Sequence, residues 1–457
     1  MNKTELHKLL NLEVNSGSPT FIIYSEKSST RLAYVSKFIF EHVLKVNVSV
    51  TDSVSEFENS SFFKINYSEK TIGNTFRIAP NGLLFETGVS EKRPKTVLKD
   101  QIVYFFENVN SIVLSGLDYD VFSAAFYFIS RYEEWQSFEK DVHGRFEAKA
   151  SILFQNNLHL KPVVDIWIQE LKQALKKTYP AIKFPENKFK VISTIDVDNL
   201  YAYKEKGFLR TVGAMCKDVL KGDVNNLNRR TRVLKNKEND PFDIYSSVSE
   251  FCADKKIPLI YFFLFRTGNK YDRTVDPGSK AFIEVFERIK KRAAFVGLHP
   301  SYYSSTNKDL LKEEVNNFSD QSKETVKLSR QHYLRFDIKT TPLLLIENGI
   351  AADFTMGFAS DVGFRAGTSF PFYYYDLGSE QQKDLLFVPF CVMDGAYFVY
   401  DKADPNKMLK SISDLVKEVK KVNGLFISVF HERTFAYHLY PGYDRIYNYL
   451  HQHINEL

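Results

Sequence analysis

The sequence of 457 residues predicts a two-domain α/β protein, in which a smaller α/β domain at residues 1–180 precedes a β/α barrel at residues 190–457. Length is one reason, because a chain of this size exceeds one ordinary domain. A second is the alternation of short apolar segments with amphipathic helical segments. A third is residues 178–188, where two prolines and several polar residues mark the best candidate for a domain boundary.

The predicted elements of the first part follow the periodicity of its apolar residues. An Asn81-Gly82 dipeptide suits the turn of a β-hairpin over residues 76–86. Asp120 is placed to cap a helix. The polar clusters at residues 131–135 and 141–146 are expected to form structural ion pairs and turns, with pocket lining as the alternative. The remaining elements are strands at 21–24, 46–50 and 111–114 and helices at 31–43, 121–135 and 162–177.

The second part has a more regular rhythm of strands and helices, which favours a closed or nearly closed β/α barrel. Its first and last strands are predicted at residues 191–197 and 425–430, and the strand predicted at 257–265 is nearly all apolar, as expected when helices cover both faces of a sheet. Further strands are predicted at 294–298, near Tyr333, and at 343–346, 363–366 and 386–392. The helices are predicted at 242–254, 280–291, 309–328 and 405–423.

Composition narrows the classes of function. The 61 basic and 56 acidic residues give a net charge of +5, and without a dense basic stripe no nucleic-acid partner is expected. Three widely spaced cysteines indicate neither a disulfide framework nor a cysteine zinc site. The N-terminus lacks the apolar core of a signal peptide, and no run is long enough to span a bilayer. A cytoplasmic protein is therefore expected.

Acidic and imidazole side chains stand at the carboxyl ends of several predicted strands. Asp196 and Asp198 end the first barrel strand, and His299 and His431 follow two later ones. In β/α folds this edge of the sheet carries the functional site. Asp and His together are ligands for a divalent metal such as zinc. Each residue alone has a structural alternative, such as capping a turn or forming a local ion pair. Arg330 and His332 flank the strand near Tyr333, and Asp353, Asp361 and Arg365 lie near the later strands.

The order of four motifs resembles the polysaccharide deacetylase family, the NodB-homology group of metal-dependent carbohydrate N- and O-deacetylases. The resemblance runs from about residue 190 to the C-terminus and implies a distorted β/α barrel. The preceding domain looks like an uncharacterised N-terminal domain of one bacterial branch of that family. The motifs are Thr194-Ile-Asp-Val-Asp198, Gly297-Leu-His-Pro-Ser301, Arg330-Gln-His-Tyr333 and the last apolar strand ending in His431.

The resemblance assigns a role to each of five residues. Asp196 matches the general base and Arg330 the residue that orients it. Asp198 and His299 match metal ligands, with Zn²⁺ the expected metal. His431 matches the general acid.

The sequence departs from the family pattern at three positions. Val197 separates the two acids, although both stay on one face of an extended strand. Tyr303 stands where the second metal histidine is expected, and His332 replaces an expected proline. Our hypothesis is that His332 supplies the third ligand.

These residues together predict a metal-dependent hydrolase that removes an acetyl or other acyl group from an amino sugar or glycan intermediate. The alternative is a catalytically degenerate barrel that binds glycans or acts as a scaffold. Tyr303 favours the alternative, and the retention of the other motif residues favours the enzyme. Several tyrosines are expected either to face sugar rings or to pack in the core: Tyr201, Tyr203, Tyr302 and Tyr373-Tyr-Tyr375.

Overall fold

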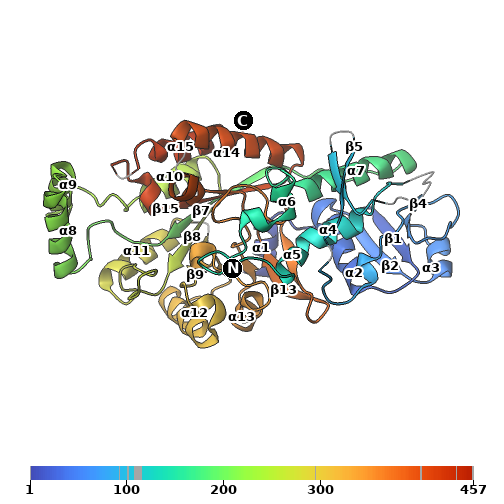
Figure 1. Ribbon diagram of the computed structural model, residues 1–457, viewed down its shortest axis with the longest axis horizontal. Helices are drawn as coiled ribbons and strands as arrows, with labels where there is room; N and C mark the ends of the chain where they lie inside the picture. Colours follow the sequence, from blue (N-terminus) through green and yellow to red (C-terminus); the bar gives the residue numbers. More distant parts are fainter. Residues whose placement is uncertain are drawn as a thin grey trace.

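The computed structural model describes residues 2–91, 93–99, 102–107, 116–293, 295–401, 404–438 and 440–454. It is a mixed α/β structure with two principal sheets (Figure 1). The first has four strands in the order β2-β1-β3-β4. The second has nine, in the order β12-β13-β11-β10-β9-β8-β7-β15-β14. Among the described residues, no helix combines the length and the apolar character needed to cross a membrane.

The four-stranded sheet is parallel and packs against helices on its flanks. β1 lies between β2 and β3, and its buried residues Phe21 and Ile23 belong to the hydrophobic core. Most elements predicted for this part are present. Their bounds are β1 (Thr20–Ser25), β2 (Asn47–Thr51), β3 (Phe63–Tyr67), β4 (Phe76–Arg77), α2 (Thr30–Lys37) with a π-helical continuation (Phe38–Val43), α4 (Val121–Ile129), α5 (Tyr132–Trp135) and α7 (Val163–Thr178).

The hairpin predicted at residues 76–86 is wrong. β4 pairs in parallel with β3, and a 3₁₀ turn (Leu83–Phe85) follows it. The backbone N–H of Asn81 donates to Asp120 Oδ2 at 2.8 Å, which holds the segment across the sheet end. Leu83 and Leu84 are buried in the core, so this segment folds inward and cannot pair back on β4. The strand predicted at 111–114 lies outside the described residues.

The nine-stranded sheet curls into a half-barrel with β7 (Lys190–Val197) between β8 (Leu259–Leu264) and β15 (Leu425–His431). Eight of its strands run parallel to one another, and β12 (Phe372–Asp376) pairs antiparallel with β13 at one edge. Among the described residues no pairing joins β12 to β14, so the sheet is open. The other strands are β9 (Phe295–His299), β10 (Leu328–Ser329), β11 (Ala352–Asp353), β13 (Gln381–Phe387) and β14 (Val392–Met393).

Helices surround this sheet, and three short segments differ from their predicted strands. Residues 343–346 lie in helix α13 (Thr341–Glu347), which has Pro342 in its first turn. A 3₁₀ turn (His332–Leu334) occupies the predicted strand near Tyr333, and residues 363–366 form a turn with Gly363 at φ +113°. Short apolar runs do not separate strand from helix by periodicity alone. The other helices are α10 (Tyr245–Asp254), α11 (Lys280–Lys290), α12 (Lys308–Ser322), α14 (Pro405–Lys421) and α15 (Tyr443–His453).

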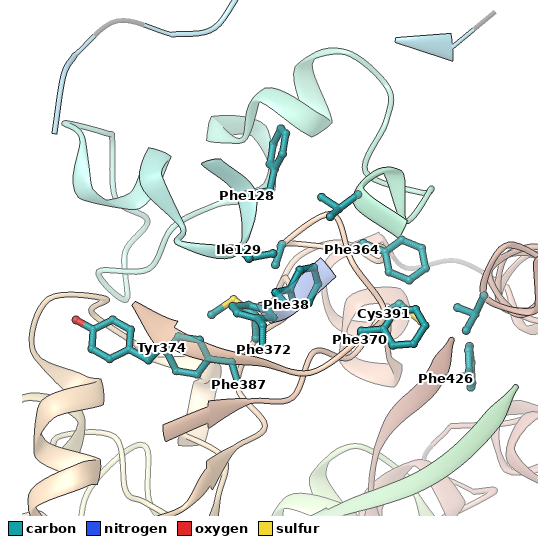
Figure 2. Packing of buried hydrophobic residues seen from close by; sticks show 14 of the residues in the cluster. Phe38, Phe128, Ile129, Phe364, Phe370, Phe372, Tyr374, Phe387, Cys391 and Phe426 are labelled. Carbon is teal, nitrogen blue, oxygen red and sulfur yellow. The ribbon is translucent and has the colours of Figure 1, made fainter. Parts of the chain in front are cut away.

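One hydrophobic cluster runs from the four-stranded sheet into the half-barrel. Figure 2 shows Phe38 and Ile129 of the first part near Phe372 of the second, and the ring centroids of Phe38 and Phe372 are 6.4 Å apart. A second cluster fills the half-barrel, and leucines of the N-terminal helix α1 (Lys3–Leu9) and of the residues after it pack into it. The two sheets are therefore packed together through a continuous core, which fixes the half-barrel relative to the first part.

A buried ion-pair network also joins the two parts. Arg131, which adopts φ +54°, donates to Glu134 at 2.8 Å and to Glu133 at 3.0 Å. Arg365 donates to both oxygens of Glu134 at 2.9 and 2.7 Å. All four side chains are buried. The polar cluster at 131–135 thus has the structural role expected from the sequence, and it accounts for Arg365 as well.

Candidate metal centre and active site

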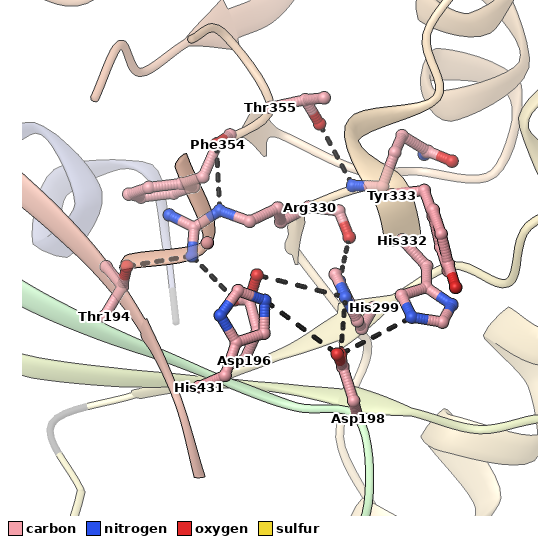
Figure 3. Close-up of polar contacts among 12 residues, drawn as sticks. Thr194, Asp196, Asp198, His299, Arg330, His332, Tyr333, Phe354, Thr355 and His431 are labelled. Carbon is pink, nitrogen blue, oxygen red and sulfur yellow. Dashed lines mark hydrogen bonds and ion pairs between the residues drawn. The ribbon is translucent and has the colours of Figure 1, made fainter. Parts of the chain in front are cut away.

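The strand-end residues predicted to act together do converge in the structure (Figure 3). Asp196 and Asp198 stand at the end of β7, and parallel pairing places His431 of β15 beside Asp196. His299 ends β9. Arg330 and His332 follow β10 directly, which brings them to the same edge of the sheet. All six side chains are buried.

Asp198, His299 and His332 form a cluster whose ligating atoms all lie within 4.8 Å of one another. Asp198 Oδ1 is 3.3 Å from His299 Nε2 and 3.5 Å from His332 Nε2. Both Asp198 Oδ1 and His299 Nε2 are buried without a hydrogen-bond partner. A buried polar atom left unpaired costs free energy unless a ligand satisfies it. Two unpaired lone-pair atoms in an Asp-His-His set therefore fit a divalent cation.

Hydrogen bonds on the far side of each imidazole aim its Nε2 at this point. His299 Nδ1 is hydrogen-bonded to the carbonyl oxygen of Arg330, and His332 Nδ1 to Asp272 Oδ1 at 2.8 Å. A neutral ring that donates its Nδ1–H to a carbonyl or carboxylate keeps a lone pair on Nε2, and this pairing is typical of metal-bound histidines. Asp272 is itself buried and also accepts the backbone N–H of Tyr302 at 3.0 Å.

The electrostatics of the cluster also favour a cation. Burial lowers the pKa of His332, but the carboxylates of Asp198 and Asp272 outweigh it and raise that pKa to about 9. Burial likewise opposes ionisation of Asp198, yet its cationic neighbours His332, His431 and Arg433 hold its pKa well below the usual range. The centre therefore stabilises positive charge next to an ionised carboxylate, and a divalent cation would replace the proton that His332 otherwise holds.

Asp196 is held by a buried arginine. Arg330 Nη1 donates to Asp196 Oδ1 at 2.7 Å and to Thr194 Oγ1 at 2.8 Å, and its Nε donates to the carbonyl of Phe354 at 3.0 Å. The guanidinium also lies over the Phe262 ring at 4.6 Å. The other carboxylate oxygen, Asp196 Oδ2, is 3.9 Å from His299 Nε2. One oxygen of Asp196 is thus fixed and the other faces the centre.

His431 has a carboxylate partner of its own. Its Nδ1 is hydrogen-bonded to Asp394 Oδ1 at 2.6 Å, and its backbone N–H donates to Asp394 Oδ2 at 2.8 Å. Burial lowers the pKa of His431, but Asp394 outweighs it and raises that pKa above its ordinary value. His431 Nε2 lies 3.8 Å from Asp198 Oδ2, which also accepts from Arg433 at 3.0 Å. The free Nε2 therefore points toward the centre.

These groups lie at the base of a pocket of about 450 Å³. Tyr271, Tyr333 and Tyr400 contribute aromatic surface to its wall, and Arg145, Lys270 and Arg273 contribute positive charge. Flat aromatic faces and cations at a pocket mouth suit a polar ring that carries a negative group. Arg145 is positioned by Asp141 Oδ2 at 2.7 Å and by the carbonyl of Tyr333, so the second polar cluster of the sequence reaches the pocket after all.

Of the tyrosines and acids proposed from the sequence, some lie near the pocket and others make structural contacts elsewhere. Tyr303 is 45% exposed and packs in an aromatic cluster beside Tyr271. Tyr302 is buried and stacks on Tyr271 with ring centroids 3.7 Å apart. Asp353 is buried against Ser329 and Thr355. Tyr203, Tyr374 and Tyr375 are buried, and the Tyr203 hydroxyl donates to Asn226. These three tyrosines therefore have structural roles.

Three functional candidates escaped the sequence reasoning. Asp394 directly follows β14, so the same strand-end rule would have found it had the strand been placed at residues 392–393. Arg433 lies two residues beyond His431. Asp272 lies in the loop after β8, where no strand-end signal exists, and only the folded chain brings it to His332.

Comparison with known proteins gives partial likenesses. Residues 21–180 match a family of unknown function (DUF7033). No curated protein matches the sequence. Structural neighbours include a Mycobacterium smegmatis protein described, without established activity, as a polysaccharide deacetylase: 13% identity, 60% of this chain and 86% of that chain covered, TM-score 0.37.

For two further structural neighbours, the match covers a smaller share of the neighbour's own chain. One is a mutant of a CE4-family pseudoenzyme with restored enzymatic activity, at 10% identity over 58% of this chain and 64% of that chain, with a TM-score of 0.29. The other is a GH138 enzyme targeting pectin rhamnogalacturonan II, at 11% identity over 90% of this chain and 58% of that chain, with a TM-score of 0.24. Likenesses this low assign no activity to the present chain.

Proposed function

We propose that this protein is a metal-dependent hydrolase of the polysaccharide-deacetylase type, which removes an acetyl group from an amino sugar or glycan intermediate. The observation that carries the proposal is the pair of buried, unpaired ligand atoms, Asp198 Oδ1 and His299 Nε2, with His332 Nε2 beside them. These atoms lie 3.3 Å apart but neither makes a hydrogen bond, although buried polar atoms with a purely structural role ordinarily do. A divalent cation, with Zn²⁺ the leading candidate, would satisfy them together.

A bound divalent ion would supply Lewis acidity for the amide carbonyl and lower the pKa of an attacking water. In the proposal, Asp196 Oδ2 accepts a proton from the attacking water, while the hydrogen bond from Arg330 to Asp196 Oδ1 fixes the orientation of the carboxylate. Water oxygen bonds to the carbonyl carbon, and the C–N bond then breaks. His431 Nε2 donates a proton to the departing amine, and Asp394 orients the ring. The products are acetate and a free amino sugar.

The pocket supports a carbohydrate substrate. Its volume of about 450 Å³ accommodates one or two sugar rings, and pockets of this size commonly hold small ligands. Tyr271 and Tyr333 offer ring faces for stacking. Lys270 and Arg273 at the same wall would bind a phosphate or carboxylate on the sugar. Phosphorylated or nucleotide-linked amino sugars are therefore included in the test below.

The test is acetate release by the zinc-loaded and cobalt-loaded protein from N-acetylated chitooligosaccharides and from uridine-diphosphate-N-acetylglucosamine. We expect Asp196→Asn and His431→Gln each to lower kcat by about 10²–10⁴-fold, the usual contribution of a general acid or base. His438→Gln, a half-buried histidine bonded to Tyr203, is the matched control and should retain full activity.

Two results would overturn the hydrolase proposal. One is acetate release that Asp196→Asn leaves unchanged. The other is saturable glycan binding by the metal-loaded protein with no acetate release from any of these substrates, which would establish the degenerate, glycan-binding alternative.

A further inference from the structure

The connection that follows site strand β7 contains two helices that project from the molecule. α8 (Phe208–Leu220) and α9 (Val224–Leu234) lie between β7 and α10. Figure 1 shows them at one end of the long axis, away from both sheets, and they contact mainly each other. This α8–α9 hairpin begins ten residues after Asp198, at Phe208. Its base therefore lies at the edge of the sheet that carries the candidate site.

α8 presents an uncovered apolar face. Phe208, Leu209 and Leu220 are 80%, 84% and 88% exposed, and Val212 and Val219 are exposed as well. At 3.6 residues per turn these five side chains fall within about a third of the helix circumference. Contiguous exposed apolar surface of this kind marks a site of interaction. Burial in the protein's own core does not explain why these residues are apolar.

The same segment is strongly basic. Residues 204–240 contain ten Lys or Arg and five Asp or Glu, a net charge of +5 that equals the net charge of the whole chain. Two of the acids form ion pairs within the segment, Asp218 with Arg230 and Glu238 with Arg229 and Arg232. Over this fully described segment the structure shows no acidic partner for Arg210, Lys217 or Lys221. The near balance of charge over the whole chain conceals this local excess.

A cationic groove continues from the hairpin to the candidate site. A cavity of about 550 Å³ at the hairpin base is lined by Lys206, Arg210 and Arg230, and its described lining contains no Asp or Glu. Lys270 and Arg273 line both this cavity and the site pocket. An anionic surface bound by the hairpin would therefore lie next to the pocket mouth.

We propose that the α8–α9 hairpin docks the protein onto an anionic membrane surface, with the apolar face of α8 at the level of the lipid headgroups and the lysines and arginines on anionic phospholipids. An amphipathic helix with Phe and Leu on one face and basic residues on the other has this binding mode. The charge of the segment favours a membrane over self-association. Docking of a second copy of this protein on α8 would bring two segments of net charge +5 together, whereas an anionic bilayer complements that charge. The proposal is independent of the hydrolase assignment.

The test is flotation of the full chain with vesicles of phosphatidylcholine alone and of phosphatidylcholine mixed with phosphatidylglycerol. We expect binding to the mixed vesicles only, and weaker binding as salt is raised. The double substitution Leu209→Ser/Leu220→Ser should weaken binding at least about tenfold, since two leucines lose their apolar burial. Lys217→Glu/Lys221→Glu should weaken it by at least about tenfold as well.

The matched control is Leu160→Ser, which alters a leucine that is 43% exposed outside the hairpin and should bind as the wild type does. Because Leu209 and Leu220 are almost fully exposed, their substitution leaves the core intact, and circular dichroism verifies this. The proposal is wrong if the mixed vesicles are not bound, or if the leucine variant binds them like the wild type. It is also wrong if sedimentation velocity shows a dimer that the leucine variant dissociates, because the face would then be a self-association surface.

Discussion

Replacing Asp272 by Asn tests the metal centre without touching a ligand. Asp272 is buried, and its Oδ1 accepts from His332 Nδ1 at 2.8 Å. A hydrogen bond to an ionised acceptor is worth about 1.5–3 kcal/mol, against about 0.5–1.5 for a neutral one. The difference, about 1–1.5 kcal/mol, corresponds to about tenfold in affinity. Substituting the outer partner of a metal-bound histidine typically costs about 10–100-fold, so we expect a loss in that range.

The assay is competition with a chromophoric chelator, which gives the Kd for zinc of the wild type and the variant. Asp165→Asn is the matched control, because Asp165 is fully buried and hydrogen-bonded to Thr368 and Ser369, outside the site. Its zinc affinity should equal that of the wild type. An Asp272→Asn protein that is folded and binds zinc with wild-type affinity would refute the role of His332 as a ligand oriented by Asp272.

Three further predictions concern stability, each measured by urea unfolding. Arg131→Met should lower the free energy of unfolding by about 3–5 kcal/mol, because it removes a buried cation that pairs with Glu134. Burial raises the pKa of Asp165 to about 7, so the folded protein holds this proton more tightly than the unfolded chain does. The free energy of unfolding of the wild type relative to Asp165→Asn should therefore fall by roughly 3 kcal/mol between pH 4 and 7. If the free energies of unfolding of the wild type and of Asp165→Asn change in the same way between pH 4 and 7, the raised pKa of Asp165 is contradicted. Gly363→Ala should cost about 3 kcal/mol or more, because a Cβ would lie 2.2 Å from the carbonyl oxygen of His159 at a φ of +113°.

The parts of the fold that were predicted from the sequence are those with a strong local signal. β7 and β15 are short runs rich in apolar and β-branched residues, and α14 has a single apolar stripe, an Asp404 cap and a Pro405 start, so these elements were placed nearly to the residue. α13 and the 3₁₀ turn at His332–Leu334 were predicted as strands, because a few apolar residues fit either period. In these segments tertiary packing decides the backbone conformation.

For the site, the strand-end rule was informative because parallel strands place their carboxyl ends at one edge. It selected Asp196, Asp198, His299 and His431, and the structure brings these together with Arg330 and His332. Asp272 reaches His332 across 60 positions of the sequence from an irregular loop. The exposure of the α8 face is equally a tertiary property, because an apolar helical stripe in a sequence ordinarily indicates a buried face.

Cobalt titration is the most direct test of the central claim that Asp198, His299 and His332 form a metal centre. Absorption of protein-bound Co²⁺ reports both stoichiometry and ligand set. We predict one ion per chain in the wild type and in His438→Ala, and loss of that binding in His332→Ala and in Asp198→Ala. A wild-type protein that binds no cobalt, or a His332→Ala protein that binds it with wild-type affinity and spectrum, would contradict the account.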